Sequence, residues 1–138
     1  MDMCNKTRQD LQKHQRTTRG PRLSDRLKLV YNLILCHQPL WDIGCDHGYL
    51  GLHAYSQQLC PEVHLVDRSR GALKNTRRRI AKWCPDEAGR RLSIWQRDAI
   101  RQTLPISRGT VVMAGLGSKT IIQMIMNLFP RQCQGGYG

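Results

Sequence analysis

The chain has 138 residues, a length typical of one ordinary domain rather than of a two-domain enzyme. Hydrophobic residues make up 40% and charged residues 23% of the sequence, values that exclude collagen-like and wholly disordered chains. The 22 Lys and Arg residues against 10 Asp and Glu residues give a net charge of +12, which favours a polyanionic partner: nucleic acid first, an anionic membrane surface second.

The first segment, residues 1–22, is rich in Gln, Thr, Lys and Arg, lacks apolar periodicity and ends at Gly20-Pro21. We predict a flexible basic tail over 1–22 and one domain over 23–138. The tail is either a solvated terminus without function or an arm that contacts RNA without sequence preference.

From Leu23 onward, helical and strand patterns alternate. The first helix has Ser24 as a candidate cap, and the helix over 71–83 is expected to bury Leu73, Thr76, Ile80 and Trp83. Alternating strands and helices predict an α/β fold, with a Rossmann-like parallel sheet between helical layers. The expected elements are a helix from 23 that stops before Pro39, a strand over 39–43, a helix over 48–59, a strand over 63–66, a helix over 71–83, strands over 92–95 and 110–114, and a helix over 119–129 that Pro130 ends.

Neither a membrane segment nor a metal site is expected. The longest apolar stretches, 29–36 and 121–129, are about half of what a membrane-spanning helix requires. The six cysteines include no CxxC pair and follow no signal segment, which is typical of reduced thiols in a cytoplasmic protein. The paired spacings of structural zinc sites are also missing.

Acidic residues gather where predicted strands end. Four of the ten acids, Asp42, Asp46, Asp67 and Asp98, lie at or just past these ends. Because ligands of open parallel sheets bind outside the carboxyl ends of the strands, we expect the four to surround one crevice. On so basic a protein, such carboxylates suit the ribose hydroxyls and amino groups of a nucleoside ligand. The alternative is that they only cap helices and turns.

The first crevice loop, residues 42–50, reads Asp-Ile-Gly-Cys-Asp-His-Gly-Tyr-Leu. Gly44 is expected to let a ligand approach the backbone, and Gly48 to adopt the unusual dihedral angles of the turn. The loop is not the dinucleotide fingerprint, because Asp46 stands where a second glycine would meet a pyrophosphate. A carboxylate there suits a cation, such as the sulfonium and α-amino group of S-adenosylmethionine. Asp67 would then bind the ribose and Asp98 the adenine amino group.

With these residues, the chain resembles the bacterial tRNA adenine-22 N1-methyltransferase family, a class I S-adenosylmethionine-dependent group. The matching segments are residues 23–27, 42–50, 66–67 with 71–75, 97–98 and 114–118. Family members continue into a seven-stranded sheet and a C-terminal helical region. The resemblance therefore implies a fragment, a truncated gene product or half of a dimer, whose fourth strand is an exposed edge that favours self-association.

Three departures from the family pattern stand out. The usual Gly-Gly appears as Gly117-Ser118, the acid of the second strand is Asp67 where Glu is common, and the tail over 1–22 has no counterpart.

The resemblance implies transfer of a methyl group from S-adenosylmethionine to N1 of an adenine in tRNA. Of the residues nearest the chemistry, Asp46 would bind the methionine part, His47 would orient the loop or touch RNA, and Tyr49 would either stack on the target base or belong to the core. The residues expected to bind the cofactor are Asp42, Gly44, Asp46, Gly48, Asp67, Arg68, Asp98, Ala99 and Gly115.

A dense basic stretch accompanies the helix over 71–83. Its residues Arg70, Lys74, Arg77 and Arg78 are expected to contact RNA phosphates, and such contacts weaken steeply with salt. A solvated face without a specific partner is the alternative.

Three functions compete at this stage. The first is a tRNA methyltransferase or a cofactor-binding piece of one. The second is a catalytically inactive remnant that binds RNA or cofactor only, and the third is a methyltransferase that acts on a small molecule or a protein. The crevice acids favour a cofactor site over bare RNA binding, and the charge disfavours the third function.

Overall fold

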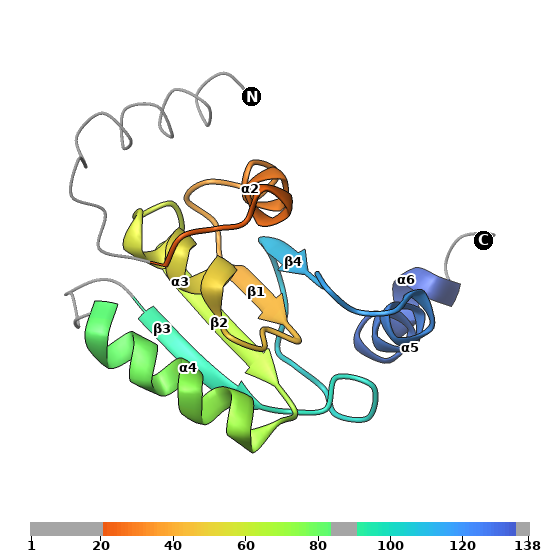
Figure 1. Cartoon of the computed structure of the whole chain (residues 1–138). Coiled ribbons are helices and arrows are strands. Elements are labelled where there is room, and N and C mark those ends of the chain that lie inside the picture. The colour runs from red at the N-terminus through yellow and green to blue at the C-terminus, as the bar shows by residue number, and fades with distance from the viewer. Residues whose placement is uncertain (1–20, 84–90, 135–138) are drawn as a thin grey trace.

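The computed structural model describes residues 21–83 and 91–134, so the predicted tail over 1–22 lies outside them except for its last two residues. Strands and helices alternate along the chain (Figure 1). In chain order the elements are α2 (Asp25–Tyr31), β1 (Leu40–Ile43), α3 (Tyr49–Ser56), β2 (Glu62–Asp67), α4 (Arg70–Trp83), β3 (Arg91–Gln96), β4 (Thr110–Val112), α5 (Ser118–Leu128) and α6 (Pro130–Gln134).

The four strands form one parallel sheet in the order β3-β2-β1-β4. Asp42 of β1 pairs with Leu65 of β2 on one side and with Val112 of β4 on the other. All four strands therefore end at the same edge of the sheet. This arrangement confirms the predicted α/β, Rossmann-like fold.

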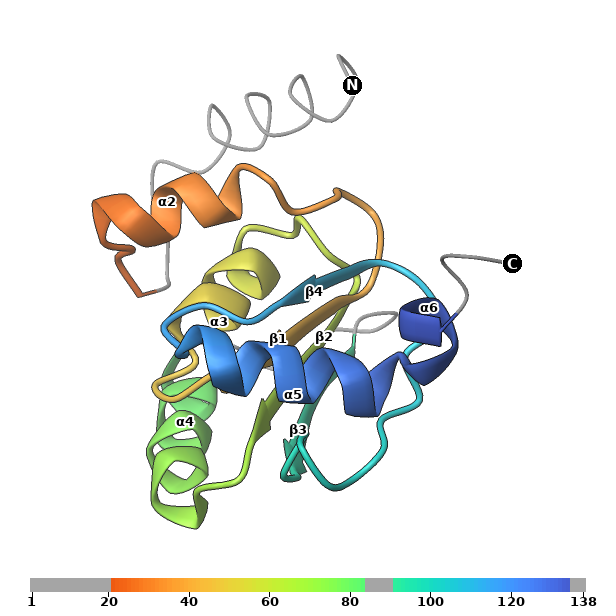
Figure 2. The ribbon, with the colours of Figure 1, turned by 90° about the vertical axis from the view of Figure 1, so that its right-hand side faces the viewer.

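Side chains of each strand alternate between two apolar layers. Leu40 and Leu65 join the layer that contains residues of α2, α3 and α4. Trp41, Ile43 and Val66 point the other way and pack with Met124 of α5. Figure 2 shows α5 crossing the sheet on the side opposite α3 and α4. The sheet is thus the middle of three layers, because period-two apolar patterning buries both of its faces.

The helices begin largely where the sequence predicts. The Ser24 side chain accepts a hydrogen bond from the backbone N–H of Leu27, so it caps α2 as expected. In α4, Leu73 and Thr76 are buried, and Ile80 and Trp83 pack against the same core from partly exposed positions.

Pro130 ends the helix before it as predicted, but the sequence did not predict the element that comes next. This residue does follow the end of α5, but it also begins a further short helix, α6. Proline lacks an N–H, and the first residue of a helix does not need one, so the residue that stops one helix is well suited to begin the next.

An aromatic cluster fixes the register of the first three strands. The Trp41 ring of β1 stacks on the His64 ring of β2 with centroids 3.9 Å apart. Trp95 of β3 donates its indole N–H to His64 Nδ1 at 2.9 Å, and His64 Nε2 lies 2.7 Å from Glu62 Oε1. Both ring nitrogens of this buried histidine are therefore satisfied.

Several large apolar side chains remain exposed on the helices and beside them. Ile122, Ile125 and Met126 form an apolar stripe along α5, and their exposed fractions are 57%, 39% and 60%. Leu29 and Leu33, in and just after α2, are more exposed still. No helix among the described residues is long and apolar enough to cross a membrane.

Candidate functional site

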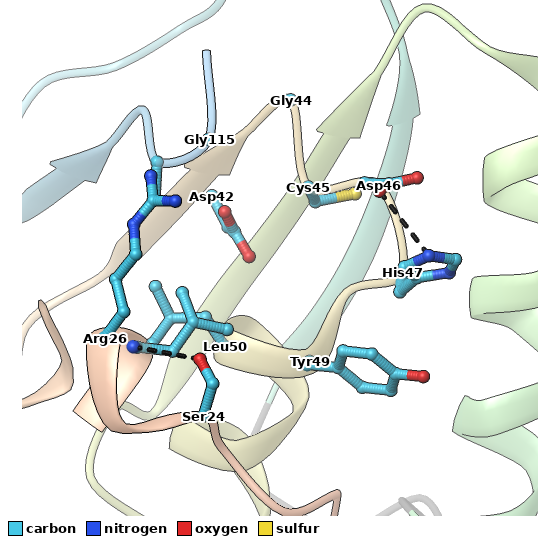
Figure 3. Close-up of a pocket in the computed structure, with 12 residues that line it drawn as sticks. Ser24, Arg26, Asp42, Gly44, Cys45, Asp46, His47, Tyr49, Leu50 and Gly115 are labelled. Carbon is cyan, nitrogen blue, oxygen red and sulfur yellow. Dashed lines mark hydrogen bonds and ion pairs between the residues drawn. The ribbon is translucent and has the colours of Figure 1, made fainter.

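Two adjoining cavities open at the edge where the strands end. The first, called here the α2 cavity, has a volume of about 250 Å³ and lies between α2 and the β1–α3 loop, residues 44–48 (Figure 3). The second, the strand-end cavity, has a volume of about 420 Å³ and is lined by the segments that follow all four strands. The two share Gly44, Asp46, Ala114 and Gly115. They therefore offer one continuous site with two compartments.

The β1–α3 loop takes an unusual backbone path. Gly44, Asp46 and Gly48 have φ angles of 68°, 50° and 72°, in the left-handed region. A Cβ atom at Gly48 would lie 2.9 Å from Thr76 Cγ2, so the structure explains this glycine as predicted. A Cβ at Gly44 would lie 3.1 Å from the Leu116 side chain. Gly44 thus lies next to the Leu116 side chain, and it also lines both cavities.

The carboxylates of the strand-end cavity are held by backbone groups. Asp67 Oδ2 accepts a hydrogen bond from the N–H of Asp46 at 2.9 Å, and Oδ1 accepts from Ser69 at 2.8 Å. Asp98 Oδ1 accepts from Ile100 at 3.1 Å. These acids do organise turns, as the alternative interpretation expected, and they line the cavity as well. Each carboxylate oxygen has further lone pairs, so a fixed acceptor remains available to a ligand.

Asp42 lies deeper, on the wall of the α2 cavity. Its side chain is 5% exposed, and its Oδ2 accepts a hydrogen bond from Gly51 N–H at 3.2 Å. Burial raises the pKa of this carboxyl from 3.8 to about 7, against the lowering effect of the Gly51 hydrogen bond and with a smaller contribution from the Asp67 charge. A cation beside Asp42 would favour its ionised form.

Burial also raises the pKa of the neighbouring Cys45 thiol, and the charges of Asp42, Asp67 and Asp46 raise it further. Cys45 lines the α2 cavity, yet it stays protonated at neutral pH. It is therefore not suited to act as a nucleophile.

His47 and Tyr49 stand at the mouth of the α2 cavity. The His47 side chain is 51% exposed, its Nε2 lies 3.6 Å from Asp46 Oδ2, and its ring centroid lies 5.4 Å from that of Tyr49. The Tyr49 hydroxyl accepts a hydrogen bond from Arg79 of α4. Figure 3 shows this hydroxyl directed away from Asp42 and Arg26. Of the two rings, His47 is the more open to an incoming group.

Several lining residues were missed by the sequence reasoning. Arg26 is the clearest case: its side chain extends from α2 toward Gly115, on one side of the Asp42 carboxylate (Figure 3). The only signal for it was its place in the matching segment 23–27. The other residues that were missed are Ser24, Leu27, Leu50 and Cys45 in the α2 cavity, and Ile43, Ser69, Ala72, Arg97, Ile100, Leu116, Thr120 and Met124 in the strand-end cavity.

The remaining predicted residues fall into two places. Arg68 and Ala99 line the strand-end cavity. Arg70, Lys74 and Arg77 instead line a shallow depression on α4 and neither of the two cavities, and Arg78 is exposed on the same helix. Over residues 21–83 and 91–134, no three His, Cys, Asp or Glu side chains come together in a way that could hold a metal ion.

The chain is similar to known proteins in sequence and in fold. A family model described as a methyltransferase domain matches residues 23–134. Among curated proteins, ribosomal RNA large subunit methyltransferase G of Erwinia tasmaniensis is 37% identical over 49 residues, which are 36% of this chain and 13% of that protein.

Two solved structures share the fold. TrmK of M. capricolum, in complex with S-adenosyl-homocysteine, is 23% identical with a TM-score of 0.61, covering 76% of this chain and 46% of that one. A Streptococcus pneumoniae protein, described there as a candidate tRNA (m1A22) methyltransferase in complex with S-adenosyl-L-methionine, is 16% identical with a TM-score of 0.59, covering 83% and 50%. The chain thus spans about half the length of these two structures.

Proposed function

Because the chain belongs to the family of methyltransferase domains, whose model matches residues 23–134, we propose that it binds S-adenosylmethionine and transfers its methyl group to N1 of an adenine in tRNA. The observation that carries this proposal is the boundary between the two cavities, called here the seam, which consists of the residues that line both. There Asp46, Gly44 and Gly115 meet, with carboxylates on both sides.

The side chains of the strand-end cavity fit the nucleoside part of the proposed cofactor. Asp67 and Asp98 present fixed acceptors in the strand-end cavity, which suits the ribose hydroxyls and the adenine amino group of a nucleoside. Ile100, Leu116 and Met124 supply an apolar wall of the same cavity for a base. The strand-end cavity is therefore assigned to the nucleoside.

The α2 cavity suits the amino-acid end of the same ligand. Asp42 and Asp46 are acceptors for its ammonium group, and Arg26 is a cation for its carboxylate. Opposite charges on two walls of one cavity match a zwitterion, whereas a phosphate would be repelled by both carboxylates. In this assignment Gly44 and Gly115, which line both cavities, would lie nearest the sulfur.

The chemistry needs orientation more than proton transfer. When bound, S-adenosylmethionine supplies an electrophilic methyl group. N1 of neutral adenine already carries a lone pair and no proton, so the site requires no general base. Holding two reactants in line contributes roughly 7 to 11 kcal/mol in favourable cases. In this scheme Asp46 and His47 orient the reactants at the cavity mouth.

RNA is the acceptor that the charge favours. Arg70, Lys74 and Arg77 are exposed side by side around a depression of about 520 Å³ on α4. Cations spaced along a helix attract a phosphate backbone irrespective of sequence. One of the two solved structures of the same fold supports tRNA, since it is described as a tRNA (m1A22) methyltransferase candidate.

Calorimetric titration of the full chain with S-adenosylmethionine tests the cofactor site. Wild type and Asp25→Asn, which changes an exposed acid of α2, are expected to bind in the micromolar range, and Asp67→Asn about tenfold or more weakly. Absence of binding by a folded wild-type chain would refute the cofactor site.

Transfer of labelled methyl groups to tRNA transcripts, with the modified nucleoside identified by mass spectrometry, tests the reaction. The product is expected to be 1-methyladenosine, and a transcript with guanine at position 22 is expected to lose it. Cofactor binding without transfer would instead support the catalytically inactive alternative. Transfer to small molecules or proteins but not to RNA would support the third function.

A further inference from the structure

We propose that Arg79 is a positioning residue for the β1–α3 loop, distinct in role from the RNA-contacting cations beside it on α4. The inference rests on the proposed function, because the loop it holds lies between the two cofactor compartments. Helix α4 would then have two faces with different roles. The outer face would contact RNA, and the inner face, which includes Arg79, would support the cofactor site.

The contacts of Arg79 reach both sides of Gly48. Its Nη1 donates to the backbone carbonyl of His47 at 3.3 Å, and its Nη2 donates to the Tyr49 hydroxyl at 3.3 Å. The guanidinium carbon also lies 4.8 Å from the centroid of the Tyr49 ring. A planar guanidinium can serve a carbonyl and a phenol at once, whereas an ammonium is a single point charge.

Thr76 completes the same inner face one turn earlier. Its hydroxyl lies 3.1 Å from the backbone oxygen of Asp46 and 3.0 Å from that of Ala72. Thr76 is fully buried, and its methyl group occupies the space that a Cβ at Gly48 would need. The backbone carbonyls of Asp46 and His47 thus accept hydrogen bonds from the Thr76 and Arg79 side chains. These two α4 residues are three positions apart, a spacing that puts both on one helix face.

The loop needs such support because its conformation is costly. Asp46 and Gly48 both have left-handed φ angles, and for a residue with a side chain this conformation persists only where the surroundings impose it. The support fixes Asp46 at the seam of the cavities and His47 at the mouth of the α2 cavity. Loss of the Arg79 contacts should therefore weaken cofactor binding.

Arg79 differs from the neighbouring arginines of α4 in its solvent exposure. Arg77 and Arg78 are exposed, whereas Arg79 is half-buried with its guanidinium turned to the loop. Arg78 therefore provides a matched control: it has the same side chain, one position away on the same helix, on the exposed face.

The test compares Arg79→Lys with Arg78→Lys in the full chain, since both substitutions keep the charge. Three quantities are measured: amide hydrogen exchange of residues 44–50 without ligand, the calorimetric Kd for S-adenosylhomocysteine, and the affinity for a fluorescent tRNA at two salt concentrations. Arg79→Lys is expected to speed exchange in the loop and to weaken cofactor binding about fivefold to tenfold, with RNA affinity within about twofold of wild type. Arg78→Lys should leave loop exchange and cofactor Kd unchanged.

Tyr49→Phe gives a second, milder variant that removes the phenol acceptor alone. Its effect on loop exchange should nearly vanish when Lys already replaces Arg79, because the two changes break the same contact. Unchanged loop exchange in Arg79→Lys would overturn the inference, and so would a loss of RNA affinity with unchanged cofactor Kd. If wild type fails to bind the cofactor, the proposed function fails, and hydrogen exchange still decides whether Arg79 holds the loop.

Discussion

The backbone N–H of Asp46 donates a hydrogen bond to Oδ2 of Asp67 at 2.9 Å, so the end of β2 holds the turn that follows β1. The same carboxylate accepts from Ser69 through its other oxygen. Asp67 thus has a structural role in addition to the ligand contact proposed for it.

Asp67→Ala should destabilise the chain by about 1 kcal/mol, because it leaves the Asp46 and Ser69 N–H groups without their acceptor. Asp67→Asn keeps one acceptor oxygen and should cost less. Urea denaturation followed by circular dichroism measures both. A negligible loss in Asp67→Ala would mean that these hydrogen bonds contribute little to the free energy of unfolding.

Gly48→Ala should destabilise the chain by about 1–3 kcal/mol, since the residue has a φ of 72° and a new Cβ would lie 2.9 Å from Thr76 Cγ2. Gly71→Ala is the matched control: it lies in the first turn of α4, its nearest neighbouring atom would be 3.9 Å from the new Cβ, and it should be neutral or slightly stabilising. Melting temperatures of both variants test this pair. A neutral Gly48→Ala would show that the loop can change its path.

Asp42 should make the chain less stable as pH rises from about 4 to about 7. Its pKa is raised to about 7 in the folded chain from 3.8, so the folded chain binds this proton more tightly than the unfolded chain does. The free energy of unfolding therefore falls across this window, by as much as about 4 kcal/mol. Asp42→Asn should remove most of the fall, whereas Asp25→Asn, at an exposed acid, should not. Urea titrations at several pH values give the comparison, and parallel pH profiles for wild type and Asp42→Asn would contradict it.

Arg26→Ala should weaken S-adenosylhomocysteine binding about tenfold, because it removes the cation assigned to the ligand carboxylate. Adenosine lacks that carboxylate, so its affinity should stay within about twofold of wild type. Arg101→Ala, at an exposed cation outside both cavities, serves as the control variant. Calorimetry with the two ligands distinguishes the outcomes: equal weakening of both would place Arg26 elsewhere than at the amino-acid end.

Binding of tRNA should weaken steeply with salt, and Lys74→Ala or Arg77→Ala should each reduce the slope of log K against log salt by about 0.7–0.9. Each substitution removes one phosphate contact from the exposed face of α4. Fluorescence anisotropy between 50 and 200 mM salt, roughly the range over which such contacts dominate, measures the slope. An unchanged slope in both variants would identify α4 as a solvated face without RNA.

Much of the fold could be predicted from the sequence because it depends on local patterns. The alternation of short apolar runs with helical periodicity defined all four strands to within a few residues, as for β1 and β2. The end of α2 at Tyr31 could not be predicted, since the apolar pattern continues to Ile34, which is buried outside the helix. Pro130 was ambiguous for a similar reason: the same ring that stops one helix also suits the start of another.

The candidate site was predictable where residues follow strands in order. Asp42, Asp67 and Asp98 lie at one sheet edge because parallel strands end together. Arg26 and Arg79 were not predictable as site residues, since their roles depend on how α2 and α4 pack against the β1–α3 loop. Sequence spacing alone does not distinguish Arg79 from Arg78; the difference appears only when the helix face that meets the loop is known.

Because the apolar stripe of α5 is exposed, the tendency of this chain to self-associate should depend on the salt concentration. At low ionic strength, the net charge of +12 should keep molecules apart despite the exposed Ile122, Ile125 and Met126. Added salt shortens the range of that repulsion to about 8 Å at physiological ionic strength and leaves the attraction between apolar side chains in place. Colloidal stability should therefore decrease in the same salt range in which RNA is released, and light scattering without RNA would separate the two processes.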